Sequence, residues 1–415
     1  MEAPKKNLHI VILGAGTTGL LIAQGLQKNE ISFSVYERQD ENTYKNHPRQ
    51  WAMGLFWGAD DIQATLPMNL RNRFNEIKAD PNYVPSPDMS NWWPMYNGKT
   101  GELITKIQAG QTGTARVSRT KMRRLFAEGL DVQYGKSAMD IKNDGAKVTV
   151  YFADGSTVEG DAVVGCDGIR SLARNILLGP EKAMLEIMPC RVVNIAQTYT
   201  ADQAVYLRYA LHPIVKLAAG HPSSPSMCIL SLLDVVDESQ PETWVFQVFF
   251  SLWGPTDQPA DNSERLALFK SAASVYAEPW RSAVLWVKDD TFVPPDVISY
   301  WKDPVKWSNW NGRLTMAGDS AHPMPPYRAQ GLNNAMQDAG HYVTSIVSVC
   351  QGEQSLNEAI TIYDDEVFER GMKEIKRSAA AGPMMHDWRQ VKDAPIAKYG
   401  VVKIQEVSNI AQAAA

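Results

Sequence analysis

The amino-acid sequence predicts an α/β fold, in which a Rossmann-type domain with a parallel sheet is joined to a second, mainly β-sheet domain and to a long C-terminal helix. Three observations predict this fold. A glycine-rich turn at residues 14–19 stands between an apolar strand pattern and a helix pattern. Strand patterns dominate residues 179–304, and one helical pattern covers about residues 354–380. A strand, a glycine turn and a helix in this order are typical of doubly wound parallel sheets.

The length and charge of the chain limit its organisation and its partners. At 415 residues it exceeds one ordinary domain, and 44% hydrophobic residues can fill two large cores. We expect residues 1–178 and 305–415 to form the two parts of a nucleotide-binding domain, the second part carrying the C-terminal helices, and residues 179–304 to form a substrate domain. The formal net charge of −5 argues against a nucleic acid as partner.

Cysteine usage and hydropathy predict a cytoplasmic protein. The four cysteines are far apart and form no CxxC pair, which argues against a zinc site or a disulfide scaffold. The chain starts without a signal-peptide pattern, and no run of about 18 apolar residues predicts a membrane span. We see no cluster of residues with metal-ligand spacing, so we expect no metal.

The first motif is a GxGxxG turn formed by Gly14, Gly16 and Gly19. It follows the apolar run at residues 8–13 and opens a helix, and the next strand pattern ends in Glu37. Glycines at these positions allow a tight turn and a close approach of the backbone to a pyrophosphate, and the acid can bind both hydroxyls of a ribose. The motif predicts a dinucleotide site but does not distinguish FAD from NAD.

A basic, aromatic segment follows at residues 48–58, and we interpret it either as a partly buried loop and strand or as a wall of a ring-binding pocket. Residues 66–115 contain many turn signals and predict hairpins. Ser118 is the expected N-cap of a helix that carries several arginines. We expect Arg123 and Arg124 on its solvated face.

The next segments predict strands at about residues 132–134, 137–142, 147–152 and 160–165. The last of them ends in Asp167 and Gly168, just before a helix start at Ser171. This arrangement directs a carboxylate and backbone amides at one place, although a simple capped turn would have the same pattern.

The region that follows predicts a sheet with a helical cover. Its strand patterns lie at residues 191–197, 204–210, 226–233 and 243–251, and a helix pattern lies at 262–276. Residues 243–251 are largely apolar on both faces, which predicts cover on both sides. The many tryptophans of this region suggest a bulky aromatic or indole-like substrate beneath it.

The most specific stretch comes last, at residues 318–339. A short strand leads into Gly318 and Asp319, a proline-rich loop follows, and a helix is predicted from Gly331 to Cys350. Prolines hold an irregular loop rigid, and a helix start offers unpaired N–H groups. A carboxylate, a rigid loop and a helix start together suit a flat, electron-accepting ring with a polyol phosphate tail.

The three motifs at residues 14–19, 166–174 and 318–339 together resemble the class A FAD-dependent aromatic monooxygenases, the group of salicylate and para-hydroxybenzoate hydroxylases. The segments at residues 48–51 and 385–388 resemble the branch of fungal secondary metabolism. The resemblance covers most of the chain and is weak over residues 66–110 and 200–300.

This resemblance implies a set of FAD-binding residues. The glycine turn would hold the pyrophosphate, Arg119 would contact the ribose or phosphate side, and Asp319 would bind the ribityl chain. The full predicted set is Gly14, Gly16, Thr18, Gly19, Glu37, Arg38, Arg119, Asp167, Asp319, Pro326, Gly331, Leu332 and Asn333. Two positions depart from the family pattern: Ala329 replaces a glycine, and Gln50 replaces an acid.

The resemblance also implies the reaction. NADPH or NADH would reduce FAD as a transient co-substrate, and O2 would form a flavin C4a-hydroperoxide that hydroxylates or epoxidises a bulky aromatic or indole-like secondary metabolite. A homodimer is left open. We expect Arg191, on the first strand of the substrate domain, to bind or polarise the substrate.

Weaker candidates near the substrate are Arg208, Tyr209, Gln247 and Phe249. We expect His322 to be structural and His386 to be a packing residue. Three other functions stay open: a flavin-dependent oxidase or cyclase without oxygen insertion, an NAD-dependent dehydrogenase, and a binding module without activity. The dehydrogenase would leave the motifs at residues 166–174 and 318–339 without a purpose.

Overall fold

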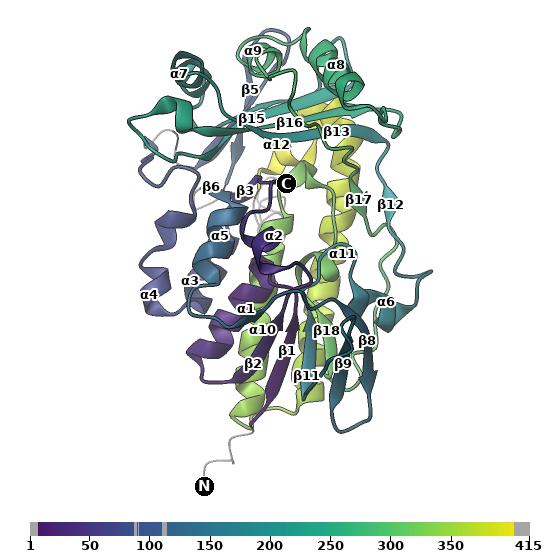
Figure 1. The fold of residues 1–415 in the computed structure, drawn as a ribbon. Coiled ribbons are helices and arrows are strands. Elements are labelled where there is room, and N and C mark those ends of the chain that lie inside the picture. Colours follow the sequence, from purple (N-terminus) through teal and green to yellow (C-terminus); the bar gives the residue numbers. More distant parts are fainter. Residues whose placement is uncertain (1–6, 87–88, 90, 110–113, 402–415) are drawn as a thin grey trace, which may run out of the picture.

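The computed structural model describes residues 7–86, 89, 91–109 and 114–401. Figure 1 shows two layers of strands, with a parallel sheet at the bottom and a larger sheet at the top. The helix α11 (Leu356–His386) rises from the lower layer to the upper one. Within the described residues, none of the helices is both long and apolar enough to cross a membrane.

The lower layer is a five-stranded sheet with the order β18-β11-β1-β2-β7, and all its strand pairs are parallel. Its strands are β1 (His9–Leu13), β2 (Ser32–Tyr36), β7 (Val132–Gln133), β11 (Ala162–Gly165) and β18 (Leu314–Met316). The central strands β1 and β11 are buried along nearly their whole length, as continuous apolar runs predict. The strands β1, β11 and β18 lie side by side, and each is followed by one of the three motifs. The three motifs therefore meet at one edge of the sheet.

The helix α1 (Thr17–Lys28) packs on β1 and β2, and the helices α3 (Gly58–Thr65) and α5 (Arg119–Phe126) pack against α1. The helix α10 (Gly331–Cys350) packs against α1, α3 and α11, and its bounds confirm the predicted helix. A three-stranded antiparallel sheet lies beside them, formed by β8 (Ala138–Asn143), β9 (Val148–Phe152) and β10 (Thr157–Gly160).

The upper layer is a six-stranded sheet with the order β13-β16-β15-β14-β4-β5. Its strands are β4 (Trp92–Tyr96), β5 (Leu103–Gln108), β13 (Cys190–Gln197), β14 (Val215–Ala218), β15 (Ser226–Asp234) and β16 (Val245–Trp253). The strands β13, β15 and β16 confirm the strands that the sequence predicts at residues 191–197, 226–233 and 243–251. The strands β4 and β5 come from residues 92–108, so this sheet also draws on chain that precedes the substrate domain as we predicted it.

Three helices cover the upper face of this sheet (Figure 1), namely α7 (Ala201–Tyr209), α8 (Asn262–Ala273) and α9 (Trp280–Leu285). The outward residues of β16 pack with these helices in one core, while the inward residues of β13 and β15 pack with α11 in another. The predicted cover on both sides of residues 243–251 is therefore confirmed.

The strand predicted at residues 204–210 is wrong, because this segment is the helix α7. Thr200 caps the helix, and the side chain of Gln203 returns a hydrogen bond to the cap, which completes a capping box. Threonine followed three residues later by glutamine was the sequence signal for this start. Arg208 and Tyr209 consequently lie on a helix, away from the inner face of the sheet.

Most tryptophans of this region lie on the outer face of the sheet. Trp244, Trp280 and Trp286 belong to the core under the covering helices. The inner face instead carries Trp93 and, partly buried, Trp253. The tryptophan content of residues 179–304 therefore gives little information about the substrate.

Short elements connect the two layers. The paired strands are β3 (Ala52–Leu55) with β6 (Ala115–Ser118), and β12 (Glu186–Ile187) with β17 (Ser299–Tyr300). The short helices are α2 (Glu41–Lys45), α4 (Met68–Arg71), α6 (Leu172–Leu178), α12 (Pro395–Tyr399), η1 (Phe74–Ile77), η2 (Pro241–Thr243), η3 (Gly318–Ser320), η4 (Pro326–Arg328) and η5 (Val391–Asp393).

Candidate active site

The glycine turn after β1 has the geometry of a phosphate-binding loop. Gly14 has φ +106°, and a Cβ there would lie 2.4 Å from the carbonyl oxygen of Cys166. A Cβ at Gly19 would lie 2.1 Å from the carbonyl oxygen of Gly14, whereas a Cβ at Gly16 would meet nothing within 4 Å. The first and third glycines are required for packing, and the second leaves open space at the start of α1.

The start of α1 has free hydrogen-bonding capacity for an anion. Its N-cap, Gly16, provides no side-chain hydrogen bond, so the first N–H groups of the helix have no partner from that side chain. Glu37 fixes the turn, because its carboxylate accepts hydrogen bonds from the N–H groups of Ala15 and Gln39, both at 3.0 Å. Thr18 is nearly buried beside Gly318, and Arg38 is exposed.

Arg119 lies at the first turn of α5, after the predicted N-cap Ser118, whose side chain accepts a hydrogen bond from the N–H of Lys121. Its guanidinium stacks 4.4 Å from the ring centre of Trp51. Burial, and next the charge of Arg123, lower the pKa of Arg119 to about 10. A half-buried cation at this position suits an anionic ligand.

The prediction for Arg124 is confirmed, because its side chain is exposed, but the prediction for Arg123 is wrong. Arg123 is 5% exposed, its guanidinium lies 3.4 Å from the ring centre of Tyr44, and it donates a hydrogen bond to the Tyr44 carbonyl oxygen. Stacking on an aromatic ring allows the arginine to be buried without a carboxylate partner.

The second and third motifs are in direct contact. The Ser320 hydroxyl donates a hydrogen bond to the Asp167 carboxylate at 2.9 Å and accepts one from the N–H of Gly168 at 3.0 Å. Arg174 donates to the carbonyl oxygens of Asp319 and Ser320, at 3.3 and 2.9 Å. Asp167 also caps α6 by accepting from the N–H of Leu172 at 2.6 Å. The two loops therefore form one rigid unit.

The side chain of Asp319 is exposed to solvent, although the surrounding protein raises the pKa of its carboxyl group by desolvation. The carboxylate is therefore open to a ligand. Pro326 is likewise exposed, at the start of η4.

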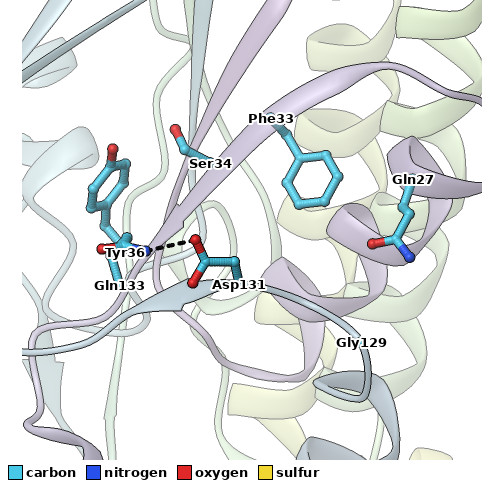
Figure 2. A pocket seen from close by; sticks show the side chains of 7 residues that line it. All are labelled: Gln27, Phe33, Ser34, Tyr36, Gly129, Asp131 and Gln133. Carbon is cyan, nitrogen blue, oxygen red and sulfur yellow. Dashed lines mark hydrogen bonds between the residues drawn. The ribbon is translucent and has the colours of Figure 1, made fainter.

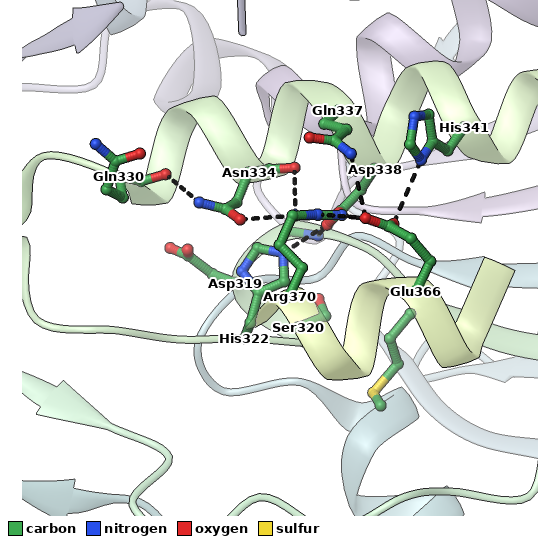
Figure 3. Close-up of polar contacts among 12 residues, drawn as sticks. Asp319, Ser320, His322, Gln330, Asn334, Gln337, Asp338, His341, Glu366 and Arg370 are labelled. Carbon is green, nitrogen blue, oxygen red and sulfur yellow. Dashed lines mark hydrogen bonds and ion pairs between the residues drawn. The ribbon is translucent and has the colours of Figure 1, made fainter. Parts of the chain in front are cut away.

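A buried ionic network supports this loop from behind (Figure 3). Asp338 accepts hydrogen bonds from the N–H of Gly318 at 2.7 Å and from the Nε2 of His322 at 2.6 Å, and it pairs with Arg370 at 2.6 Å. Burial by itself raises the pKa of Asp338, but His322 and Arg370 lower it well below its usual value. Arg370 also pairs with Glu366 at 2.7 Å. This is the structural role that we expected for His322.

The start of α10 is joined to the segment after β3. The Asn333 side chain accepts hydrogen bonds from the N–H groups of Phe56 and Gly58, at 2.8 and 3.2 Å, and donates to the Gly54 carbonyl oxygen at 3.2 Å. Leu332 is nearly buried and Gly331 is partly exposed. Because no side chain caps α10, its first N–H groups can face a ligand.

The structure places the substrate candidates on different faces of the upper sheet. Arg191 shares the outer face with Val193 and Phe250, close to α8, and it pairs with Asp257 at 3.3 Å. This position does not support the expected contact with a substrate under the sheet. Arg208 is buried in a pair with Asp80, and Tyr209 is exposed.

Gln247 and Phe249 lie on the inner face of the sheet, opposite Ala196 and Asn194 of β13. Gln247 is buried and receives a hydrogen bond from Arg116, a residue that sequence reasoning did not single out. The sequence pattern gave no signal for the contact between Arg116 and Gln247. This contact depends on which face of its strand each residue occupies and on which strands are neighbours.

The inner face also carries a chain of buried hydrogen bonds that the sequence did not reveal. Tyr327 contacts Ser251 at 3.1 Å, and Ser251 contacts the Nε2 of His386 at 2.8 Å. The Nδ1 of His386 lies 2.7 Å from the Gly382 carbonyl oxygen, which can only accept. His386 therefore carries its proton on Nδ1, Ser251 donates to Nε2, and Tyr327 donates to Ser251.

A separate pocket of about 410 Å³ lies at the edge of the lower sheet beside β7 (Figure 2). Its lining residues are Gln27, Phe33, Ser34, Tyr36, Gly129, Asp131 and Gln133. None of the predicted cofactor-binding residues belongs to this set, so we do not assign the cofactor to it.

Comparison with known proteins decides the family. Residues 106–378 match the family described as "FAD binding domain". The chain is 37% identical over 397 residues to FAD-dependent monooxygenase phnB of Penicillium herquei, which covers 94% of each chain. It is 29% identical to FAD-dependent monooxygenase cctM of Talaromyces islandicus, covering 97% of this chain and 98% of that one. The chain belongs to the family of FAD-dependent monooxygenases.

Solved structures of this kind share the fold. Klebsiella pneumoniae HpxO complexed with FAD and uric acid has a TM-score of 0.73 at 19% identity, covering 98% of this chain and 96% of that one. A salicylate hydroxylase substrate complex has a TM-score of 0.68 at 17% identity, covering 94% and 92%. The FAD-dependent monooxygenase fold is thus a Rossmann-type α/β fold, as the sequence predicts, and the protein is an oxidoreductase.

The residues of this monooxygenase fit FAD. The open position above Gly16, the uncapped starts of α1 and α10, and the exposed carboxylate of Asp319 provide donors for phosphates and an acceptor for hydroxyls at one edge of the lower sheet. The family assignment, FAD-dependent monooxygenases, argues against the alternative of a simple NAD-dependent dehydrogenase.

Proposed function

We propose that the protein uses FAD, O2 and NADPH or NADH to hydroxylate or epoxidise a bulky aromatic small molecule. The turn at Gly14, Gly16 and Gly19 would hold the pyrophosphate, and Glu37 would bind the adenosine ribose. Asp319 would bind the ribityl hydroxyls, and Arg119 would neutralise phosphate charge. The single observation that carries this proposal is the contact of the second and third motifs through Ser320, next to the glycine turn.

The remaining predicted residues would complete the cofactor site. Asp167 would fix the backbone near the phosphates, and Thr18 and Arg38 would border the adenosine half. Pro326, Gly331, Leu332 and Asn333 would lie along the ring, with the uncapped N–H groups of α10 directed at its polar edge. Bound flavin supplies the electrons and the site at which O2 is activated for transfer to an aromatic carbon.

The upper sheet would exclude water and hold the substrate. Its inner face offers apolar side chains at Val192, Met227 and Phe249, and the relatives' names support oxygen insertion rather than simple oxidation. One related protein, 6-hydroxynicotinate 3-monooxygenase of Pseudomonas fluorescens, is named for a reaction on an aromatic ring. An apolar cover over a reactive centre limits side reactions with water.

The decisive experiment uses the purified protein with naphthol as a probe substrate. We expect a yellow protein with one FAD, nicotinamide oxidation that requires O2, and 18O from labelled O2 in the product. Oxidation of the probe without label would indicate an oxidase or cyclase instead. A preparation that stays colourless after addition of FAD would contradict the cofactor assignment.

A variant tests the ribityl contact. We expect Asp319→Asn to weaken FAD binding roughly tenfold or more, because a charged acceptor for hydroxyl donors becomes a neutral amide. The matched control is Asp365→Asn, which changes an exposed aspartate on α11. Equal FAD dissociation constants for Asp319→Asn and the wild type, measured by flavin fluorescence, would remove Asp319 from the site.

A further inference from the structure

Arg116 lies between the start of α10 and the inner face of the upper sheet. It belongs to β6, where it pairs with Gly54 of β3. The carbonyl oxygen of Gly54 accepts a hydrogen bond from Asn333, in the first turn of α10, at 3.2 Å. Arg116 is therefore one strand away from the helix start that would face the flavin ring.

The guanidinium of Arg116 reaches the upper sheet. It donates a hydrogen bond to the Oε1 of Gln247 at 2.8 Å and lies 5.9 Å from the ring centre of Trp93. Gln247 in turn donates to the Oδ1 of Asn194 at 2.8 Å. A cation and two amides thus form a row along the inner face, next to the partly buried ring of Phe249.

No carboxylate within the described part of the chain pairs with this cation. Among the described residues, Arg116 forms no ion pair and makes one side-chain hydrogen bond, and its Nε is buried without a partner. Desolvation lowers its pKa to about 9. An arginine can donate five hydrogen bonds, so most of this capacity is unused. A desolvated cation that has one hydrogen bond and no carboxylate partner among the described residues favours an anionic ligand.

Three other buried or partly buried arginines are neutralised by carboxylates, whereas Arg123, Arg174 and Arg265 are held by carbonyl oxygens or by an aromatic ring. The pairs are Arg208 with Asp80, Arg328 with Glu374, and Arg370 with Asp338. Each of these pairs connects elements of the fold. Arg116, by contrast, is partly buried and keeps some of its surface accessible, so that its free donors can meet a molecule that enters under the upper sheet.

We propose that Arg116 binds an ionised acidic group of the aromatic substrate, a phenolate or a carboxylate, while Gln247 and Asn194 fix its orientation. This proposal rests on the proposed function. The planar fork of a guanidinium matches the two oxygens of a carboxylate and also stabilises a single phenolate oxygen. A phenolate at this position would in addition enrich its ring in electrons for attack on activated oxygen.

The test measures binding to the FAD-loaded enzyme and needs no turnover. The proposal about Arg116 can therefore be contradicted while the proposed monooxygenase reaction is confirmed, and the reverse. Two pairs of probes are titrated while the flavin spectrum is followed: naphthoate against naphthamide, and naphthol against methoxynaphthalene. Each pair differs in an acidic group and hardly in shape. The absorption of naphthol also reports whether it binds as naphtholate.

We expect wild-type enzyme to bind at least one acid roughly tenfold tighter than its neutral partner, as a charge-assisted hydrogen bond predicts. In Arg116→Met the preference should fall to about twofold or less, and bound naphthol should keep the spectrum of the neutral form. Arg116→Lys, which keeps the charge and loses the fork, should retain part of the preference. The acid that wild-type enzyme prefers identifies the substrate group as phenol or carboxylate.

Three outcomes would overturn the proposal. The first is a wild-type enzyme that binds neither acid more tightly than its neutral partner. The second is an Arg116→Met variant that keeps the wild-type preference for the acid. The third is an Arg116→Met variant that loses FAD while Arg116→Lys retains it. In the last case Arg116 would serve the cofactor. The control is Arg124→Met, which removes an exposed arginine from α5 and should bind all probes as the wild type does. Circular dichroism checks folding, and Arg116→Gln replaces Arg116→Met if that variant is unfolded.

Discussion

At the scale of single residues, the loop before α10 contains a strained backbone position. Ala329 ends η4 with φ +53° and ψ +32°, the left-handed region in which a Cβ is unfavourable. It is also the position where the resemblance predicts glycine. The alanine therefore adopts a backbone conformation that glycine would adopt at a lower energetic cost.

Ala329→Gly should raise the free energy of unfolding by about 0.5–1 kcal/mol, because glycine adopts this conformation freely and only part of the gain is offset by its freedom in the unfolded chain. Urea unfolding of the FAD-free protein measures the change. The control Ala210→Gly, at φ −57° after α7, should destabilise instead. An Ala329→Gly variant no more stable than the wild type would show that position 329 is not strained.

At the scale of elements, β18 and α11 are joined through a buried acid. Asp364 accepts hydrogen bonds from the hydroxyl of Thr315 and from the Nδ2 of Asn309, the latter at 2.9 Å. Burial raises its pKa to about 7, while hydrogen bonds oppose the shift. The acid is thus favoured in its protonated form in the folded protein.

The raised pKa makes part of the stability depend on pH. Because the folded protein holds the proton more tightly than the unfolded chain, the stabilisation is complete below about pH 4 and is lost as the pH rises to about 7. Relative to wild type, Asp364→Asn should therefore gain stability over this window, by about 2–4 kcal/mol. Unfolding curves at several pH values test this, with the exposed neighbour Asp365→Asn as control. A difference that stays constant with pH would contradict the assignment.

At the scale of the whole molecule, the two layers are held together by buried polar contacts. Tyr327 of the loop before α10, Ser251 of the upper sheet and His386 of α11 form one chain of hydrogen bonds. Burial lowers the pKa of His386 to about 4. Its neutral form is the one that can accept from Ser251 while donating to Gly382.

Protonation of His386 should separate the layers in acid. Since the folded pKa lies below that of the unfolded chain, stability is lost as the pH falls from about 6.5 to about 4. In His386→Gln the free energy of unfolding should fall less steeply in acid, by up to about 1.4 kcal/mol per pH unit. The variant should be less stable than the wild type at neutral pH, because hydrogen bonds of His386 are lost. His341→Gln removes a half-exposed histidine and should keep the wild-type slope. A wild-type slope in His386→Gln would contradict this role.

The sequence by itself determined the lower layer and the positions of its three motifs. Strand, turn and helix signals there are local, and glycine, proline and aspartate at the turns restrict the backbone within a few residues. The same holds for β13, β15, β16 and α8, whose patterns were read correctly. The segment at residues 204–210 was assigned to the wrong element, because a short helix and a short strand have similar apolar patterns. The hairpins predicted over residues 66–115 are also only partly right, because α4 and η1 occupy the first part of that stretch.

The tertiary structure alone decided which side chains meet under the upper sheet. A strand directs alternate residues to opposite faces, so Arg191 lies on the outer face and Asn194, three positions later, lies on the inner one. Arg116 and Gln247 are 131 residues apart, and no local pattern brings them together. Burial also shifts the pKa of a group such as the Arg116 guanidinium, and burial follows from the packing of the folded molecule rather than from the local sequence.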